Sequence, residues 1–213
     1  LVFYFYKPSS NIPVLHVFCL GDIVAGMNSV GAWSSSYIDL DIYDQMIQGF
    51  TSLRDALVVW AQAFKEVKFY GVYGNHGRVS KKGDQKDYTN WDRICYEFLK
   101  ISMSNYSNIS WNIPKAWFLQ ERILNHNFYV THGDGIHGSM GVPYYGVERA
   151  ERLILGLMPE KPDYMILGHF HSPAELQTNS GRIIMNGSFL GGDMYSLRDL
   201  RRKDRPEQKL FGI

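Results

Sequence analysis

The chain is poor in cysteine, in net charge and in long apolar runs. Only two of its 213 residues are cysteines, Cys19 and Cys95, so we expect two small buried side chains and no disulfide framework. The formal net charge of +1 gives no overall attraction to nucleic acid or to a membrane. No apolar run approaches the ~18 residues of a membrane span. The stretch Leu1 to Tyr6 is too short for a signal peptide. We therefore expect one domain over residues 1–213, in the cytoplasm and without membrane contact.

Three segments repeat apolar residues every three or four positions, which predicts amphipathic helices. Asp41 is a suitable cap for a helix that continues through Phe64. Thr89 and Asp92 resemble a capping box at the start of the second helix, and Pro143 to Leu157 is the third. The predicted inward residues are Tyr43, Met46, Phe50, Leu53, Leu57, Trp60 and Phe64; Trp91, Ile94, Cys95, Phe98 and Ile101; and Val147, Ala150, Leu153, Ile154 and Leu157.

Short apolar runs bounded by turn residues predict the strands. Helix-linked strands occur early in the chain and hairpins occur late, which favours a layered α/β fold with sheets covered by helices. One hairpin is expected to turn at Asn125-His126. The predicted strands are Val14–Leu20, Val67–Tyr73, Ala116–Ile123, Asn127–Thr131, Tyr164–Leu167, Ala174–Gln177, Arg182–Met185 and Lys209–Ile213.

Four of these strands end alike, passing from apolar residues to a glycine beside oxygen or imidazole side chains. Each ending alone is most often a turn, but four together indicate a site at the carboxyl ends of the strands. Glycine allows the tight turns and close backbone approach that such a site needs. The endings are Gly21-Asp22, Gly74-Asn75-His76, His132-Gly133-Asp134 and Gly168-His169-Phe170-His171.

Carboxylate, amide and imidazole ligands without thiolates suit manganese, iron or zinc ions. Two such ions ~3.5–4 Å apart could clamp an in-line displacement at phosphorus, with a bridging water as the nucleophile. A shared carboxylate would hold the ions together, and Asp22 is the candidate for it.

In their order and spacing the motifs resemble those of the calcineurin-like metallophosphoesterase family, whose pattern is D-x-H, G-D, G-N-H-[DE] and His motifs ending in G-H-x-H. The resemblance covers residues 14 to about 190. It implies a β-sandwich of mixed sheets flanked by helices, and two divalent ions, manganese being favoured over iron, zinc or magnesium. It also implies that His76 contacts the phosphate and protonates the leaving oxygen. The implied ligands are Asp22 between the ions, Asn75, His132 and His169 in one site, and His171 in the other.

The chain departs from this pattern twice. It lacks D-x-H, which we expect to precede Leu1 in an N-terminally truncated chain, so one metal site retains only Asp22 and His171 and is incomplete. We therefore expect at most one well-held ion. The acid that follows G-N-H in the family is replaced by Gly77, and Asp134 is a candidate substitute for it.

The favoured function is nuclease-like hydrolysis of phosphodiester bonds, with DNA as the substrate. A basic loop after His76 supports a phosphate contact, and Arg78 and His137 are candidate substrate-binding residues. A phosphomonoesterase, a small-nucleotide phosphodiesterase and a degenerate, non-catalytic binding scaffold remain as alternatives. The resemblance also leaves open a homodimer or an ATPase partner. The basic loop contains Arg78, Lys81, Lys82 and Lys86.

Overall fold

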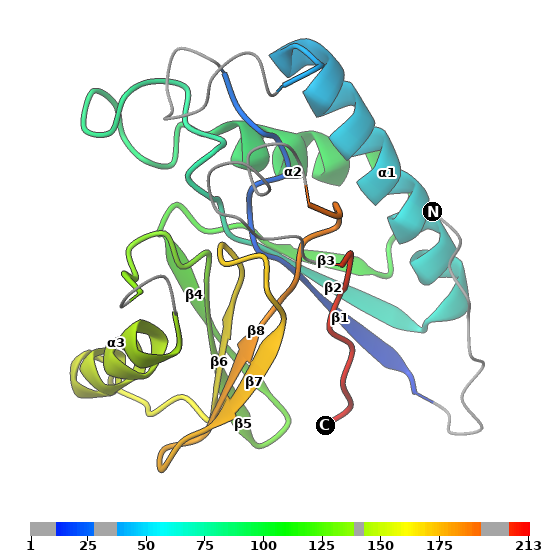
Figure 1. Ribbon diagram of the computed structural model, residues 1–213. Helices are drawn as coiled ribbons and strands as arrows, with labels where there is room; N and C mark the ends of the chain where they lie inside the picture. Colours follow the sequence, from blue (N-terminus) through cyan, green and yellow to red (C-terminus); the bar gives the residue numbers. More distant parts are fainter. Residues whose placement is uncertain (1–11, 28–37, 139–142, 193–204) are drawn as a thin grey trace. The chain divides into compact units, whose positions relative to one another are not determined.

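The computed structural model describes residues 12–27, 38–138, 143–192 and 205–213 (Figure 1). The chain divides into two compact units, Leu1–Gly31 with Leu40–Lys115, and Ala32–Asp39 with Ala116–Ile213. Helices accompany one β-sheet in each unit, which confirms the predicted α/β class with sheets flanked by helices. None of the helices in the described part of the chain combines the length and the apolar character that a bilayer crossing requires.

The first unit is a parallel sheet in the order β1-β2-β3, connected by two helices (Figure 1). The third strand was not predicted from the sequence. The elements are β1 (Val14–Cys19), α1 (Ile42–Ala63), β2 (Glu66–Gly71), α2 (Trp91–Ser102) and β3 (Ile109–Asn112).

Helix α1 has the start and the end that the sequence predicts. The Asp41 side chain accepts a hydrogen bond from the Asp44 backbone N–H at 2.9 Å, and the helix is capped at Phe64. Leu57 is fully buried, and the other predicted inward residues pack against the same core with one exception. Tyr43 was wrongly placed inside, since 69% of it is exposed in the first turn.

Helix α2 buries a stripe that shares only Cys95 with the predicted one. Its N-cap is Asn90 rather than Thr89. The prediction that Phe98 and Ile101 face inward is wrong, because these side chains are 55% and 68% exposed. The buried stripe follows the helical period but begins with an aspartate, so apolar periodicity identified only Cys95 of it; it consists of Asp92, Cys95, Tyr96 and Leu99.

Both helices cover the same face of the first sheet. Val67, Phe69 and Gly71 alternate along β2 toward this face, and the first two belong to one core cluster with Leu57 of α1 and Leu99 of α2. A Cβ on Gly71 would lie 2.6 Å from the Tyr96 ring, so glycine makes the space for that buried ring.

The second unit has a mixed sheet in the order β4-β5-β6-β8-β7, with its three central strands parallel. The β4–β5 hairpin turns at Leu124 and Asn125, and not at Asn125-His126 as predicted, because His126 pairs with Ile123 inside the ladder. The predicted strand Lys209–Ile213 is wrong, since no strand forms there. The elements are β4 (Phe118–Ile123), β5 (His126–Thr131), α3 (Tyr144–Leu157), β6 (Tyr164–Leu167), β7 (Ala174–Gln177) and β8 (Arg182–Met185).

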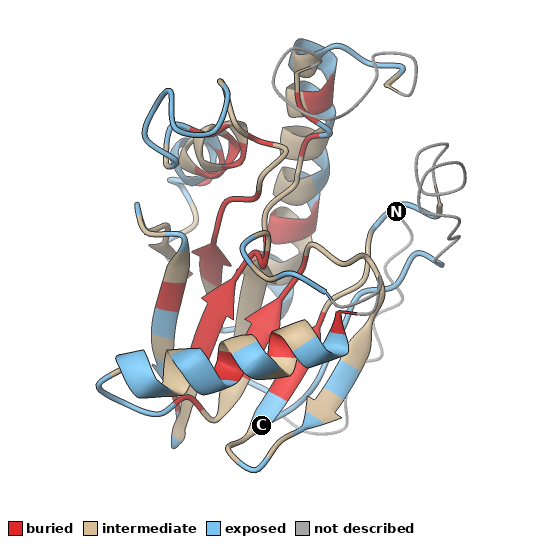
Figure 2. Ribbon diagram, turned by 60° about the vertical axis from the view of Figure 1, so that its left-hand side comes forward, coloured by how far each residue is buried: buried red, intermediate tan, exposed pale blue. Residues whose placement is uncertain are grey.

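Helix α3 contacts the second sheet through a narrow stripe, and most of its surface is exposed or half-buried (Figure 2). Val147 is fully buried in the core of this unit. Leu153 and Leu157 were predicted to face inward but are 61% and 78% exposed. Glu151 occupies the buried position instead, where its carboxylate accepts a 2.7 Å hydrogen bond from the Thr178 hydroxyl.

Candidate metal centre

In the first unit, two of the predicted motifs meet beyond the ends of adjacent parallel strands. The ladder continues past β1 and β2, where the Val72 N–H donates to the Cys19 carbonyl at 3.0 Å. The turns that follow are therefore neighbours. A Cβ on Gly21 would lie 2.3 Å from the Gly74 nitrogen, so these two turns touch through backbone atoms and require glycine.

Asp22 and His76 lie together in this pair of turns. The His76 N–H donates to Asp22 Oδ1 at 2.9 Å, and His76 Nε2 lies 3.9 Å from Asp22 Oδ2. A Cβ on Gly74 would lie 2.2 Å from Asp22 Oδ1, so the glycine of the G-N-H motif also provides space for this carboxylate.

A backbone carbonyl orients the His76 ring. Nδ1 of His76 lies 3.0 Å from the Ala25 carbonyl oxygen. Because a carbonyl can only accept, Nδ1 is the nitrogen that carries the proton in the neutral ring, and Nε2 is its acceptor nitrogen. A Cβ on Gly26 would lie 2.4 Å from the His76 carbonyl oxygen, so the chain also passes close to His76 here.

Asp92 is a residue of this region whose part the sequence reasoning missed. It is fully buried at the start of α2 and accepts hydrogen bonds from the backbone N–H groups of Asp22, Ile23 and Gly74 at 2.9, 2.9 and 2.8 Å. Burial raises the pKa of the Asp92 carboxyl above its usual range, the negative charge of Asp22 raises it further, and the three backbone bonds oppose the rise. In the sequence, Asp92 is recognisable only as the acid of a capping box.

The structure gives a steric reason for Gly77, where the family has an acid. A Cβ at position 77 would lie 2.1 Å from Asn90 Oδ1 and 3.0 Å from the Asp92 carboxyl carbon. Any side chain on residue 77 would therefore displace the cap of α2. Asp134 belongs to the second unit, and its suggested role as a substitute stays a prediction.

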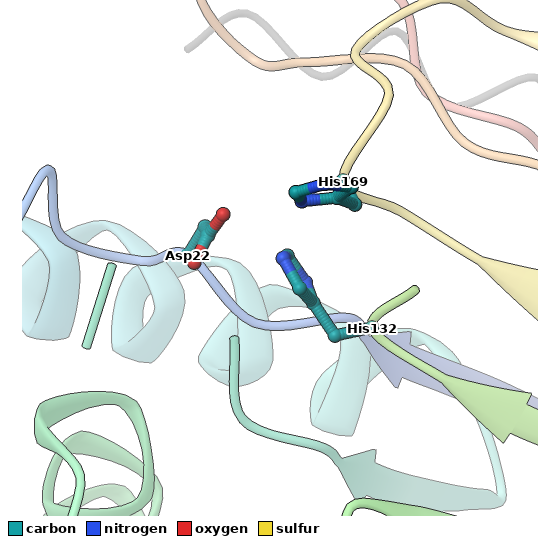
Figure 3. Close-up of side chains that lie close together, drawn as sticks. All are labelled: Asp22, His132 and His169. Carbon is teal, nitrogen blue, oxygen red and sulfur yellow. The ribbon is translucent and has the colours of Figure 1, made fainter. Parts of the chain in front are cut away.

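In the second unit, the predicted histidines follow β5 and β6, which are parallel neighbours. His132 is only 2% exposed, and its carbonyl accepts a 3.0 Å hydrogen bond from the Gly168 N–H. The rings of His132 and His169 lie edge to face, with centroids 5.1 Å apart (Figure 3). Asp22, drawn in the same figure, follows β1. His171 comes two residues after His169, beyond the end of β6.

The backbone conformation separates these residues from ordinary turns. Within the described residues, four that are not glycine have a positive φ, and three of them are predicted ligands: Asp22 at 54°, His169 at 64° and His171 at 60°. The fourth is Leu124, in the tight turn of the β4–β5 hairpin. Left-handed backbone is uncommon outside glycine, although aspartate and histidine adopt it more often than most side chains, so its coincidence with three motif residues is informative.

The structure gives no comparable observation for three other predicted site residues, Asn75, Arg78 and His137. Asn75 stands between Gly74 and His76 and is half-buried. Arg78 is also half-buried and pairs with Asn90 in an isolated bridge. His137 is exposed on the segment after β5. The roles of these three residues stay predictions.

Comparison with known proteins gives structural likeness only. No protein-family model matches the chain, and no curated protein matches it. Zinc-bound Vps29 from Entamoeba histolytica aligns with a TM-score of 0.41 and 11% identity over 84% of this chain and 75% of that one. A predicted phosphoesterase from Streptococcus pneumoniae aligns at 0.37 and 9% over 83% and 72%. An archaeal phosphodiesterase aligns at 0.37 and 14% over 83% and 84%. At these values the likeness carries no argument about what this chain does.

Proposed function

We propose that this chain is a metal-dependent phosphoesterase that hydrolyses phosphodiester bonds. The observation that carries the proposal is the positive φ of Asp22, His169 and His171. Such backbone costs about 1–3 kcal/mol per residue that is not glycine, persists where the surrounding structure holds it, and clusters at active sites and ligand clamps. Glycine, asparagine and aspartate are the usual residues of such turns, so the two histidines are the more informative of the three.

The proposed ligands fit divalent transition ions. From the motif resemblance, we propose that Asp22 supplies a carboxylate oxygen and that His132 and His169 each supply an imidazole nitrogen as metal ligands. Asn75 and His171 are the remaining proposed ligands. This donor set, without thiolate, suits manganese, iron or zinc. A bound ion would supply Lewis-acid polarisation of a phosphoryl oxygen and would lower the pKa of an attacking water.

His76 is the proposed proton donor. The Ala25 carbonyl holds Nδ1, so Nε2 is the nitrogen that would pass a proton to the leaving oxygen. The hydrogen bond from the His76 N–H to Asp22 fixes the position of this residue relative to a proposed ligand. The proposed proton donor and a proposed metal ligand therefore lie in neighbouring turns.

We favour DNA as the substrate because cations gather around one aromatic ring in the first unit. Lys86 Nζ, Arg93 Cζ and Lys115 Nζ lie 5.9, 5.8 and 5.4 Å from the centroid of the Tyr88 ring. Clustered cations bind phosphates, and an aromatic ring can stack on a base. Arg78 belongs to the same basic loop as Lys86.

Metal-dependent hydrolysis of a chromogenic phosphodiester, compared with the matching monoester, tests the proposed activity. We expect manganese to stimulate cleavage of the diester preferentially. His132→Ala should lower the rate at least about 100-fold, which exceeds the 10–100-fold effect typical of residues that only orient a ligand. His126→Ala is the matched control, because this histidine lies at the opposite end of the same strand, and it should retain the wild-type rate.

Each other outcome would contradict part of the proposal. Preference for the monoester would refute phosphodiester specificity. Tight manganese binding without hydrolysis of either ester would indicate a binding scaffold. Failure to cleave linear DNA, with the small diester cleaved, would refute the DNA substrate. Equal activity of the His132→Ala and His126→Ala variants would refute the proposed role of His132 as a metal ligand.

The DNA contact has its own test in the salt dependence of binding. Loss of one phosphate contact should reduce the slope of log affinity against log salt concentration by about 0.9 for duplex DNA. We expect this reduction for Lys115→Ala. Lys65→Ala, an exposed lysine of the same unit outside the Tyr88 cluster, should leave the slope unchanged. An equal slope for both variants would contradict the contact.

A further inference from the structure

We propose that Asp92 is a positioning residue, whose carboxylate fixes the two turns that carry Asp22 and Asn75. The inference rests on the proposed metal site, since it assigns the residue that holds two of its ligands in place. Asp92 itself belongs to α2 and is fully buried.

One carboxylate joins the two turns directly. Asp92 Oδ2 accepts from the Asp22 N–H at 2.9 Å and from the Gly74 N–H at 2.8 Å. Oδ1 accepts from the Ile23 N–H at 2.9 Å. The turns after β1 and β2 are therefore held by a common oxygen atom, and the position of one turn depends on that of the other.

The arrangement requires a side chain that only accepts hydrogen bonds. Three backbone N–H groups converge on two oxygen atoms, and loss of an acceptor would leave a buried donor unsatisfied. An asparagine at position 92 has one oxygen and one NH₂ group. In either orientation of the amide, an NH₂ group would face at least one of these N–H groups.

Asn90 extends the same attachment to the other side of the Gly74 peptide. Its Nδ2 donates to the Gly74 carbonyl at 2.8 Å, while its Oδ1 accepts from the Asp92 N–H at 2.9 Å. Asp92 binds the N–H of Gly74 and Asn90 binds its carbonyl, so both polar groups of the residue before Asn75 are fixed by the start of α2.

The constraint continues from Asp92 to the proposed proton donor. Asp92 holds the backbone of Asp22, and the carboxylate of Asp22 accepts from the His76 N–H. A displacement of the Asp92 carboxylate would therefore move Asp22, a proposed ligand, and with it His76, which follows the proposed ligand Asn75. A buried aspartate that served only to start α2 would not need to accept hydrogen bonds from the Asp22, Ile23 and Gly74 N–H groups.

Manganese affinity and amide hydrogen exchange of the full chain test the proposal. Asp92→Asn should weaken manganese binding about 10–100-fold, as residues that orient metal ligands do. It should also lower the exchange protection of at least one of the Asp22, Ile23 and Gly74 amides about tenfold or more, since their bonds would open locally. Leu99→Ala is the matched control, because it leaves a cavity in the same buried stripe without touching these bonds. It should lower the melting temperature but keep manganese affinity within about twofold of wild type.

Asn90→Ser is the second variant, in case Asp92→Asn does not fold. Serine can still cap α2 but is too short to reach the Gly74 carbonyl, so we expect a several-fold loss of manganese affinity with the helix intact. Wild-type affinity in the folded variants, or an equal loss in Leu99→Ala, would overturn the positioning role. Failure of the wild-type chain to bind manganese would instead refute the proposed function, and the exchange measurements would still decide whether Asp92 holds the turns.

Discussion

Gly77→Ala is the substitution that most directly tests the geometry around Asn90. The added Cβ would lie 2.1 Å from Asn90 Oδ1 and 2.9 Å from its Cγ, against 3.4–4 Å for ordinary contact. Asn90 is 1% exposed and holds both the Asp92 N–H and the Gly74 carbonyl, so it cannot move without losing these bonds. We expect the variant to fold with reduced stability.

The expected loss is about 2–4 kcal/mol of unfolding free energy. Overpacking costs about 1–3 kcal/mol, loss of an N-cap bond about 1 kcal/mol, and loss of the bond to the Gly74 carbonyl about 1 kcal/mol. These terms overlap, because a single movement of Asn90 relieves the clash and breaks both bonds. The lower flexibility of alanine in the unfolded chain returns about 0.4–1 kcal/mol.

Urea denaturation of single and double variants measures this loss. In an Asn90→Gly background only the 3.0 Å approach to the Asp92 carboxyl carbon remains, so the Gly77→Ala penalty should shrink by about 1–3 kcal/mol, as expected for residues in contact. Gly156→Ala is the control for the chemical change, since a Cβ there meets no atom within 4 Å. In a helix this change should be stabilising by about 1 kcal/mol. Additive effects at positions 77 and 90 would refute the contact.

Three further predictions concern other parts of the molecule. Burial, and then the charge of Asp92, raises the pKa of the Cys95 thiol to about 12, and burial likewise raises the pKa of Cys19; a thiol reagent at pH 8 should label both only after unfolding. Burial, and then Lys68, lowers the pKa of His16 below 6.5, so protonation favours the unfolded state; stability should fall as the pH drops below 6.5, and less so in His16→Gln. Metal at 100 times its Kd should stabilise the fold by about 2.7 kcal/mol, so its removal with a chelator should lower the melting temperature. An unchanged melting temperature would contradict a bound ion.

The strands and glycines at the proposed site could be predicted because their signals are local. A buried strand, a glycine and a ligand side chain follow one another within a few residues, as in Leu167, Gly168 and His169. Helix α1 was predicted for the same reason, since Asp41 and the apolar period are contiguous in the sequence. The positive φ of the ligands could not be predicted, because aspartate and histidine, although enriched there, adopt it in only a minority of positions.

Asp92 could not be assigned from the sequence, because the groups that satisfy it are remote. Its bond to the Asp22 N–H spans 70 residues, and its bond to the Gly74 N–H spans 18. A search for apolar periodicity places an aspartate outside the helix stripe, and this choice also turned the predicted face of α2 toward Phe98 and Ile101. The burial of one polar residue therefore accounts for both errors.

The arrangement around Asp92 changes how Gly77 is interpreted. By resemblance, an acid after G-N-H would orient the histidine, so glycine at this position favoured a degenerate scaffold. Here the Ala25 carbonyl orients the His76 ring. The buried acid is Asp92 of α2, which binds the backbone N–H of Gly74 in the turn before His76. A side chain on residue 77 would compete with Asn90 for the same space. Glycine at position 77 is thus a requirement of the Asn90–Asp92 attachment, and it no longer counts as a sign that the activity was lost.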